Sequence, residues 1–290
     1  MGKHDFSRIS ACRIAQTRSS RFTLVGLILL TLCPGTSHAE PDQDPAFYSL
    51  EDWAPVQKWE YFAVPTALAA TLGLNLAGSP PSRWRGGILF DDWARNELEL
   101  KSEAARSHAA TASTVLLFGV GGLPFLLDAG LLTGLIHRRK DLAWEMFVMD
   151  AEALTLAGLI TEATKRISGR ERPTGPGEND SFFSGHTSVA AAAATLVCLQ
   201  HVQLELLGNS AADAAVCGAA AATALTTGLL RVMSDRHYAS DVIVGAAAGA
   251  GSALLVYNLH VRRTPAERTA LRISPLLRPD SLGLSFAGGF

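Results

Sequence analysis

Eight residues in the second half of the chain could together bind an anion and move protons: Lys165, Arg172, Ser184, Gly185, His186, Arg231, His237 and Asp241. They fall into three groups. Two cations are separated by six residues, a Ser-Gly-His tripeptide follows, and an arginine, a histidine and an aspartate come last. Each group alone is weak evidence, because cations at helix ends and His–Asp pairs four residues apart are common on protein surfaces.

Taken together, these residue types suit phosphoryl transfer. The transition state of that reaction spreads negative charge over three oxygens, so catalysis depends mainly on positioning and electrostatic stabilisation. Arginine matches phosphate oxygens two at a time, lysine adds a point charge, and a serine at a helix start supplies further donors. Two histidines can divide the nucleophilic and acid–base work. All three groups fall at expected helix ends, and these ends alternate correctly to meet on one face of an antiparallel bundle.

The three groups resemble the signature of the type-2 phosphatidic acid phosphatase and vanadium haloperoxidase superfamily, which reads K-x6-RP, PSGH and SR-x5-H-x3-D. The resemblance is most specific over residues 165–241, and its helix pattern extends over roughly 111–260. Phe183 stands where the signature has proline, and Leu230 stands where it has serine. The missing serine removes one hydrogen bond to a bound phosphate.

The resemblance implies a metal-independent phosphatase whose catalytic residues are His237, His186 and Asp241. His237 would attack phosphorus and form a phosphohistidine, while Asp241 would hold the other ring nitrogen. His186 would protonate the leaving oxygen and then activate a water molecule. The implied phosphate-binding residues are Lys165, Arg172, Ser184, Gly185 and Arg231. No metal or cofactor is expected, although vanadate could bind in the place of phosphate.

Two other functions are compatible with the same residues. A vanadium-dependent haloperoxidase would hold vanadate in the same cationic cluster, but members with that activity tend to be longer chains. An envelope protein with an idle site would have no activity. For a phosphatase, the expected substrates are phosphate monoesters or diphosphates, either lipids or isoprenoids, or small soluble molecules. The formal net charge of −2 gives no sign of a nucleic-acid partner, and oligomeric state is left open.

Composition and periodicity predict an all-α protein built as an antiparallel helix bundle. Hydrophobic residues make up 48% of the chain and charged residues 18%, a mixture typical of extensive buried helix surface. We expect an N-terminal arm with peripheral helices over 40–110, including helices over 61–77 and 90–110. The catalytic bundle covers 111–263, and a tail over 264–290 could pair as a β-hairpin.

The first 39 residues differ in kind from the rest. Five cations face one acid, an apolar run covers Phe22 to Cys33, and a small-residue pattern ends at Ala39. These features are typical of a secretory signal peptide cleaved before Glu40, and the apolar run is short for the alternative, an uncleaved membrane anchor. Export would place the protein in the periplasm or on the extracytoplasmic face of the membrane. Cleavage leaves Cys198 and Cys217, which could form a disulfide if their helices make a hairpin near Gly208.

The sequence leaves membrane spanning undecided between two sets of observations. The apolar segments are long enough to cross a bilayer, and the basic clusters at 137–140 and 262–263 would lie on one side. Against this, Asp150 and Glu152 fall within one helix, and four polar residues crowd the end of another: Gln200, His201, Gln203 and Glu205. Charged groups in lipid are costly unless they face protein, so we slightly favour a soluble or peripheral bundle at a membrane surface.

Overall fold

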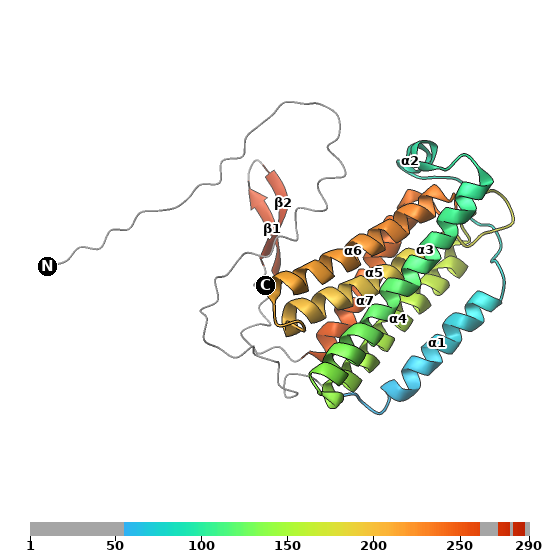
Figure 1. The fold of residues 1–290 in the computed structure, drawn as a ribbon. Coiled ribbons are helices and arrows are strands. Elements are labelled where there is room, and N and C mark those ends of the chain that lie inside the picture. The colour runs from blue at the N-terminus through green and yellow to red at the C-terminus, as the bar shows by residue number, and fades with distance from the viewer. Residues whose placement is uncertain (1–54, 262–271, 279–280, 288–290) are drawn as a thin grey trace. The chain divides into compact units, whose positions relative to one another are not determined.

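The computed structural model describes residues 55–261, 272–278 and 281–287, and it confirms an all-α antiparallel bundle. Figure 1 shows the long helices packed side by side. The helices are α1 (Glu60–Leu76), α2 (Asp91–Leu98), α3 (Glu103–Leu123), the π-helical continuation η3 (Pro124–Ile136), α4 (Lys140–Ser168), α5 (Gly185–Leu204), α6 (Ser210–Met233) and α7 (Ala239–His260). Consecutive helices from α3 to α6 run in opposite directions, so the helix ends that carry the expected site residues lie at the same end of the bundle.

The C-terminal hairpin is also confirmed, and it belongs to a unit separate from the helices. Strand β1 (Arg272–Arg278) pairs antiparallel with strand β2 (Ser281–Ala287), with Arg272 opposite Ala287. The bundle and its expected site therefore rest on the helical unit alone. The expected signal peptide over 1–39 lies outside the described residues.

Polar side chains at three loop-to-helix junctions start the helices that carry the site. The Ser184 hydroxyl caps α5 by accepting from the Thr187 N–H, and the Asn209 side chain caps α6 by accepting from two backbone N–H groups. At the start of α7, the Asp241 carboxylate accepts from the Tyr238 N–H at 2.9 Å. Such caps satisfy donors that a helix start leaves unpaired, so two expected site residues also define where their helices begin.

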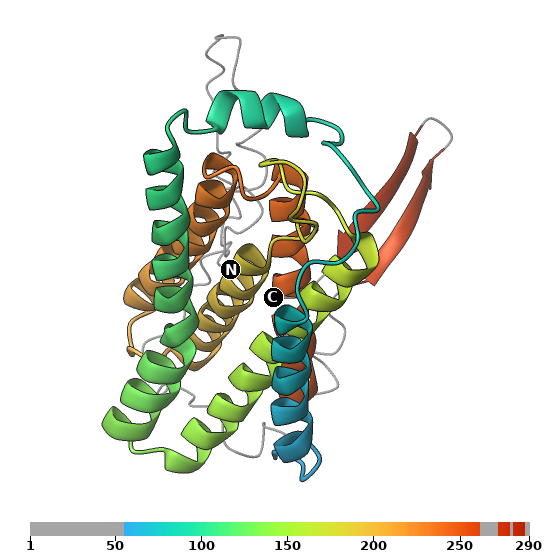
Figure 2. The same cartoon turned by 90° about the vertical axis from the view of Figure 1, so that its right-hand side faces the viewer.

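The pattern over 90–110 predicts one amphipathic helix, and this prediction is wrong. Helix α2 ends at Leu98, Glu99 is extended, and α3 begins after Ser102, whose hydroxyl accepts from the Ala105 N–H. A serine with a free N–H three residues ahead is a strong helix start. The break lets α2 turn across the end of the bundle, as Figure 2 shows.

Helix α5 lies centrally, and two glycines of α7 allow α7 to pack directly against it. A Cβ atom at Gly249 would lie 1.8 Å from the Ser188 carbonyl oxygen, and one at Gly245 would lie 2.7 Å from the Ser184 carbonyl oxygen. Small residues four apart permit this close approach of helix backbones. The contact brings the start of α7 against the start of α5, where the expected catalytic residues lie.

Four helical segments are long and apolar enough to cross a membrane: Glu103–Ile136, Gly185–Leu204, Ser210–Met233 and Ala239–His260. Large apolar side chains are exposed on their outer faces, among them Phe118 at 74%, Leu126 at 77% and Leu259 at 65%. Exposed apolar surface this extensive indicates contact with lipid or another apolar partner. The bundle is that of a membrane protein.

Three of the polar residues that argued against spanning are fully buried against protein partners. Asp150 accepts from the Gln200 amide at 2.7 Å, and both side chains are fully buried. His201 lies between two carboxylates, 2.6 Å from Asp213 and 3.1 Å from Asp128. Paired polar groups of this kind are tolerated inside a membrane bundle, so the preference for a soluble or peripheral bundle is reversed.

The cysteine pair forms the hairpin cross-link that the sequence allowed. Cys198 of α5 and Cys217 of α6 are joined by a disulfide, with their Cα atoms 4.4 Å apart. The bond ties the two helices that leave the Gly208 turn. Cys12 and Cys33 lie outside the described residues.

Candidate active site

All three sequence groups meet at one end of the bundle, which we call the site end. His186, at the start of α5, interacts electrostatically with Arg231, His237, Lys165 and Arg172. These residues come from the ends of α4, α6 and α7 and from the loop between α4 and α5. The structure therefore brings together the histidines and cations that the sequence placed in separate stretches.

His237 is 3% exposed and has one ring nitrogen fixed by the backbone. Its Nδ1 atom donates to the Ser181 carbonyl at 2.8 Å and lies 3.8 Å from the Asp241 Oδ2 atom. Because a neutral imidazole carries one N–H, donation from Nδ1 leaves the lone pair on Nε2. Burial first, and then Arg231 and Arg172, lower the pKa of His237 to about 4, against the opposite effect of Asp241.

Asp241 supports His237 less directly than the resemblance implies. The atom that accepts from the His237 ring is the Ser181 carbonyl oxygen, whereas Asp241 is held by the Ser181 hydroxyl at 2.6 Å and by Arg170 at 2.5 Å. Asp241 thus supplies a nearby negative charge and fixes Ser181, while Ser181 orients the ring. Ser181 carries no recognisable sequence signal, because any residue could provide that carbonyl.

Arg170 is the most important residue that the sequence signature does not include. It lies in the loop between α4 and α5, where a cation is usually exposed, but Arg170 is fully buried. Its guanidinium bonds to Asp91 at 2.8 Å and to Asp241, and it lies 4.1 Å from the ring centroids of both Trp84 and Tyr238. Cations over aromatic faces are stabilised most when desolvated. Arg170 therefore positions Asp241 and is not available to bind a substrate anion.

The three expected phosphate-binding cations differ in the side chains that they already contact. Lys165 contacts Glu162 at 2.7 Å, and Arg172 makes a two-pronged contact with Asp180 at 2.9 and 2.8 Å. Nearby Arg172 lowers the pKa of Asp180 in spite of its burial. Two cations are therefore held in place by acids before any ligand arrives.

Arg231 is the cation best prepared for an anion. It is 6% exposed, and its guanidinium donates to the Ser113 hydroxyl at 3.4 Å. Its Nε atom is buried without a hydrogen-bond partner in the part of the chain that the structure describes. An unpaired buried donor is costly, and an oxyanion would satisfy it.

The Ser-Gly-His tripeptide forms the start of α5 beside these cations. A Cβ atom at Gly185 would lie 3.5 Å from the Lys165 Nζ atom, so the ammonium group lies beside the start of α5. The His186 Nε2 atom lies 3.0 Å from the Thr114 hydroxyl of α3. A helix start with cations around it is a ready binding site for phosphate.

Helix α2 and the loops hold the site end together. The Asp91 carboxylate accepts from the Ser240 N–H at 2.8 Å, and Arg95 makes a two-pronged contact with Asp235 at 2.7 and 2.8 Å. Asp235 is 4% exposed although it lies between α6 and α7. Segments far apart in sequence are therefore locked over the same end of the bundle (Figure 2).

Comparisons with known proteins find their matches in the region of the sequence that carries the site. Residues 151–265 match the model of the PAP2 superfamily, and they include all eight expected site residues. A lipid A 1-phosphatase of Porphyromonas gingivalis is 37% identical over 119 residues. That similarity covers 41% of this chain and 25% of the relative, so the chain spans about a quarter of the length of the curated relative it matches.

Two solved structures are also similar. The LpxE structure of Aquifex aeolicus is 20% identical with a TM-score of 0.41, and covers 59% of this chain and 96% of its own. A transmembrane PAP2-type phosphatidylglycerolphosphate phosphatase from Bacillus subtilis is 21% identical with a TM-score of 0.39, and covers 66% and 95%. The region over residues 151–265, whose signature residues gather at one end of the helices, therefore matches the PAP2 superfamily.

Proposed function

We propose that the protein is a metal-independent phosphatase that hydrolyses a lipid phosphate through a phosphohistidine at His237. The observation that carries this proposal is the orientation of His237. Its Nδ1 atom is committed to the Ser181 carbonyl, which leaves Nε2 as a neutral nucleophile next to buried cations. A surface histidine or an idle structural one would not need this arrangement.

In the proposed reaction, the substrate phosphate is bound by Lys165, Arg172 and Arg231 at the start of α5. Arg231 gains the partner that its Nε atom lacks. Arg172 exchanges some of its contact with Asp180 for phosphate oxygens, which its planar fork can bind in pairs. The cations offset the charge that develops on the equatorial oxygens.

Two displacements at phosphorus then complete the reaction. In the first, the His237 Nε2 atom forms a bond to phosphorus as the bond to the leaving oxygen breaks, and His186 donates a proton to that oxygen. In the second, His186 takes a proton from water as the water oxygen attacks phosphorus and the P–N bond breaks. Phosphate leaves, and both histidines return to their starting states.

A lipid substrate is supported by two observations. The outer faces of the long helices expose large apolar side chains, so the site end lies where a bilayer-embedded chain meets its headgroup region. The similar P. gingivalis protein is a lipid A 1-phosphatase. We therefore propose a phosphate carried on a lipid headgroup as the substrate class.

A phosphate-release panel tests the proposed activity. Purified full-length protein in detergent receives phosphatidate, phosphatidylglycerol phosphate, an undecaprenyl diphosphate analogue and a soluble aryl phosphate, all with chelator present. We expect release from a lipid phosphate, inhibition by vanadate, and activity that persists at pH 5 and is lost below it as His237 is protonated near its pKa of about 4. Peroxide-dependent halogenation with vanadate, without phosphate release, would contradict the proposal.

We further propose that the site end faces away from the cytoplasm. The basic turn at His137–Lys140 lies at the other end of α4, and positive charge is retained on the cytoplasmic side. A membrane-impermeant thiol reagent should then label Thr174→Cys but not Lys140→Cys in intact cells, in a chain whose Cys12 and Cys33 are serine.

The same labelling tests the signal peptide. Helix α1 begins at Glu60, at the end opposite the site, so a spanning bundle with an outward site keeps residue 60 inside. A signal cleaved before Glu40 would instead deliver that residue outside. Labelling of both cysteines would indicate export of the whole bundle, whereas protection of Thr174→Cys would contradict an outward site.

A further inference from the structure

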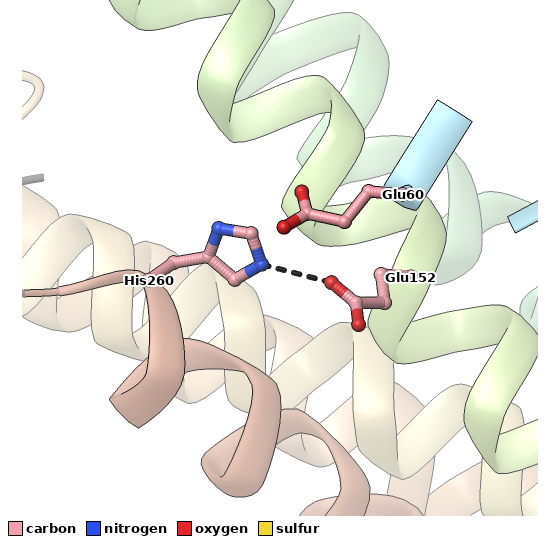
Figure 3. A group of neighbouring side chains, drawn as sticks. All are labelled: Glu60, Glu152 and His260. Carbon is pink, nitrogen blue, oxygen red and sulfur yellow. Dashed lines mark hydrogen bonds and ion pairs between the residues drawn. The ribbon is translucent and has the colours of Figure 1, made fainter. Parts of the chain in front are cut away.

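A second group of charged side chains lies away from the site end, where α1, α4 and α7 meet. Glu60 begins α1, Glu152 lies on α4, and His260 ends α7. One ligand-type atom from each lies within 4.8 Å of the others. Figure 3 shows the Glu60 and Glu152 carboxylates on the same side of the His260 ring. None of the three belongs to the signature that the proposed activity uses.

The Glu60 carboxylate is the feature of this group that needs an explanation. Glu60 is 4% exposed, and its Oε2 atom is buried without a hydrogen-bond partner among the described residues. By contrast, His260 Nε2 and Glu152 Oε2 already contact each other at 2.8 Å. A buried carboxylate oxygen that is left unpaired is costly, yet Glu60 points toward the pair and not toward solvent (Figure 3).

A second acid on α4 adds to the negative charge here. Glu145 lies two helical turns before Glu152, so both carboxylates face the same strip of α4. Glu145 accepts from the Val56 N–H at 2.7 Å and thereby fixes the segment that leads into Glu60. The position of Glu60 is thus imposed by the fold, which holds acids together around one imidazole.

We propose that Glu60, Glu152 and His260 bind a divalent transition-metal ion, with Zn²⁺ the best match. Zn²⁺ is bound by imidazole nitrogen and carboxylate oxygen, and three protein ligands can leave a fourth position open to water. An imidazole ligand disfavours Mg²⁺ and Ca²⁺, which take oxygen ligands. Ligand atoms around a tetrahedral Zn²⁺ lie about 3.3 Å apart, so a small rotation of the Glu60 side chain closes the site.

The ion would act as a structural clamp and not as part of phosphoryl transfer. Glu152 precedes Lys165 by 13 residues on one helix, which corresponds to about 20 Å at the α-helical rise. Binding would join the first helix of the bundle to the last and to α4 between them. This role is independent of the proposed phosphatase activity, which is expected to continue in chelator.

Metal content and thermal unfolding of the untagged full-length protein in detergent test the site. After growth with added zinc, elemental analysis should find about one Zn²⁺ per chain. Removing the ion by chelation should lower the unfolding temperature, and Zn²⁺, but not Mg²⁺, should restore it. Mn²⁺ is the third metal ion to be added back, because it is also compatible with carboxylate and imidazole ligands.

Four variants distinguish the loss of a metal ligand from the loss of a negative charge near the site. Glu60→Gln, Glu152→Gln and His260→Gln should each weaken Zn²⁺ binding by at least about 100-fold, since even residues behind a ligand contribute 10–100-fold. Glu145→Gln is the matched control, because it removes a neighbouring negative charge without removing a ligand. It should bind Zn²⁺ within about threefold of the unchanged protein, a difference typical of surface charges.

Two results would overturn the proposal. One is the absence of zinc after purification together with no change in unfolding temperature on adding Zn²⁺. The other is equal stabilisation of the unchanged protein and of Glu60→Gln by Zn²⁺, which would place the ion elsewhere. Because Glu60→Gln keeps the size and shape of the side chain, loss of binding in a folded variant would not reflect a disrupted helix.

Discussion

Alanine in place of His237 is expected to lower phosphate release by at least about 10⁴-fold, the scale on which nucleophile removal acts in enzymes with a covalent intermediate. The reason is that the change removes the ring nitrogen proposed to form the P–N bond, while the cations still bind the substrate. KM should therefore change little compared with kcat. Steady-state kinetics on the preferred substrate of the panel measures both constants.

Trapping the intermediate sharpens this prediction. Acid-labile, base-stable label from a ³²P-labelled aryl phosphate should appear on the unchanged protein during turnover and be absent from His237→Ala. With this good leaving group, His186→Ala should accumulate label, because its lost base slows hydrolysis of the phosphohistidine more than its formation. The exposed residue His108 supplies the control, since His108→Ala removes an imidazole outside the site. Equal labelling of His237→Ala and the unchanged protein would exclude His237 as the nucleophile.

Replacement of Arg170 by methionine should produce the largest loss of stability among single changes at the site end. It strips the shared cation from the buried carboxylates of Asp91 and Asp241, and removing one member of a buried charge pair typically costs about 3–5 kcal/mol. For a domain of this size we expect the unfolding temperature to fall by roughly 10 °C. Thermal unfolding followed by circular dichroism measures the change.

Two further variants serve as controls for this test. One keeps the positive charge at position 170, and the other removes an exposed cation. Arg170→Lys keeps the charge but loses the fork that reaches both carboxylates, so its stability should be intermediate. Arg85 contacts Glu171 with 78% of its side chain exposed, and Arg85→Met should change stability by no more than about 0.5 kcal/mol. Stability of Arg170→Met within about 1 kcal/mol of the unchanged protein would mean that the buried network contributes little.

Much of the site could be predicted because local chemistry and helix ends encode it. Lys165, His186 and His237 sit where a helix ends or begins, and alternation of helix direction alone sends those ends to one side. Helix lengths and the C-terminal hairpin follow from apolar runs and turn residues in the same local way. The start of α3 was misplaced, because the break at Glu99 depends on the cap at Ser102 competing with a continuous amphipathic pattern.

Other features depend on how each helix is rotated about its own axis, which no local pattern records. Arg170 and Arg172 are both cations of one loop, yet one is enclosed between Trp84 and Tyr238 and the other faces Asp180. His201 is matched to Asp128, 73 residues away, across the bundle. From sequence, such polar residues argue against a membrane bundle, because their partners are not visible.

The sequence by itself determined the set of chemical groups, their places at helix ends, and the match of residues 151–265 to the PAP2 superfamily. Tertiary structure alone decided that the Ser181 carbonyl orients His237, that Arg170 holds Asp241, and that Glu60 meets Glu152 and His260. These contacts join residues that are between 56 and 200 positions apart in the sequence. They form only when helix packing fixes the direction of each side chain and so places its polar atoms to within a few ångströms.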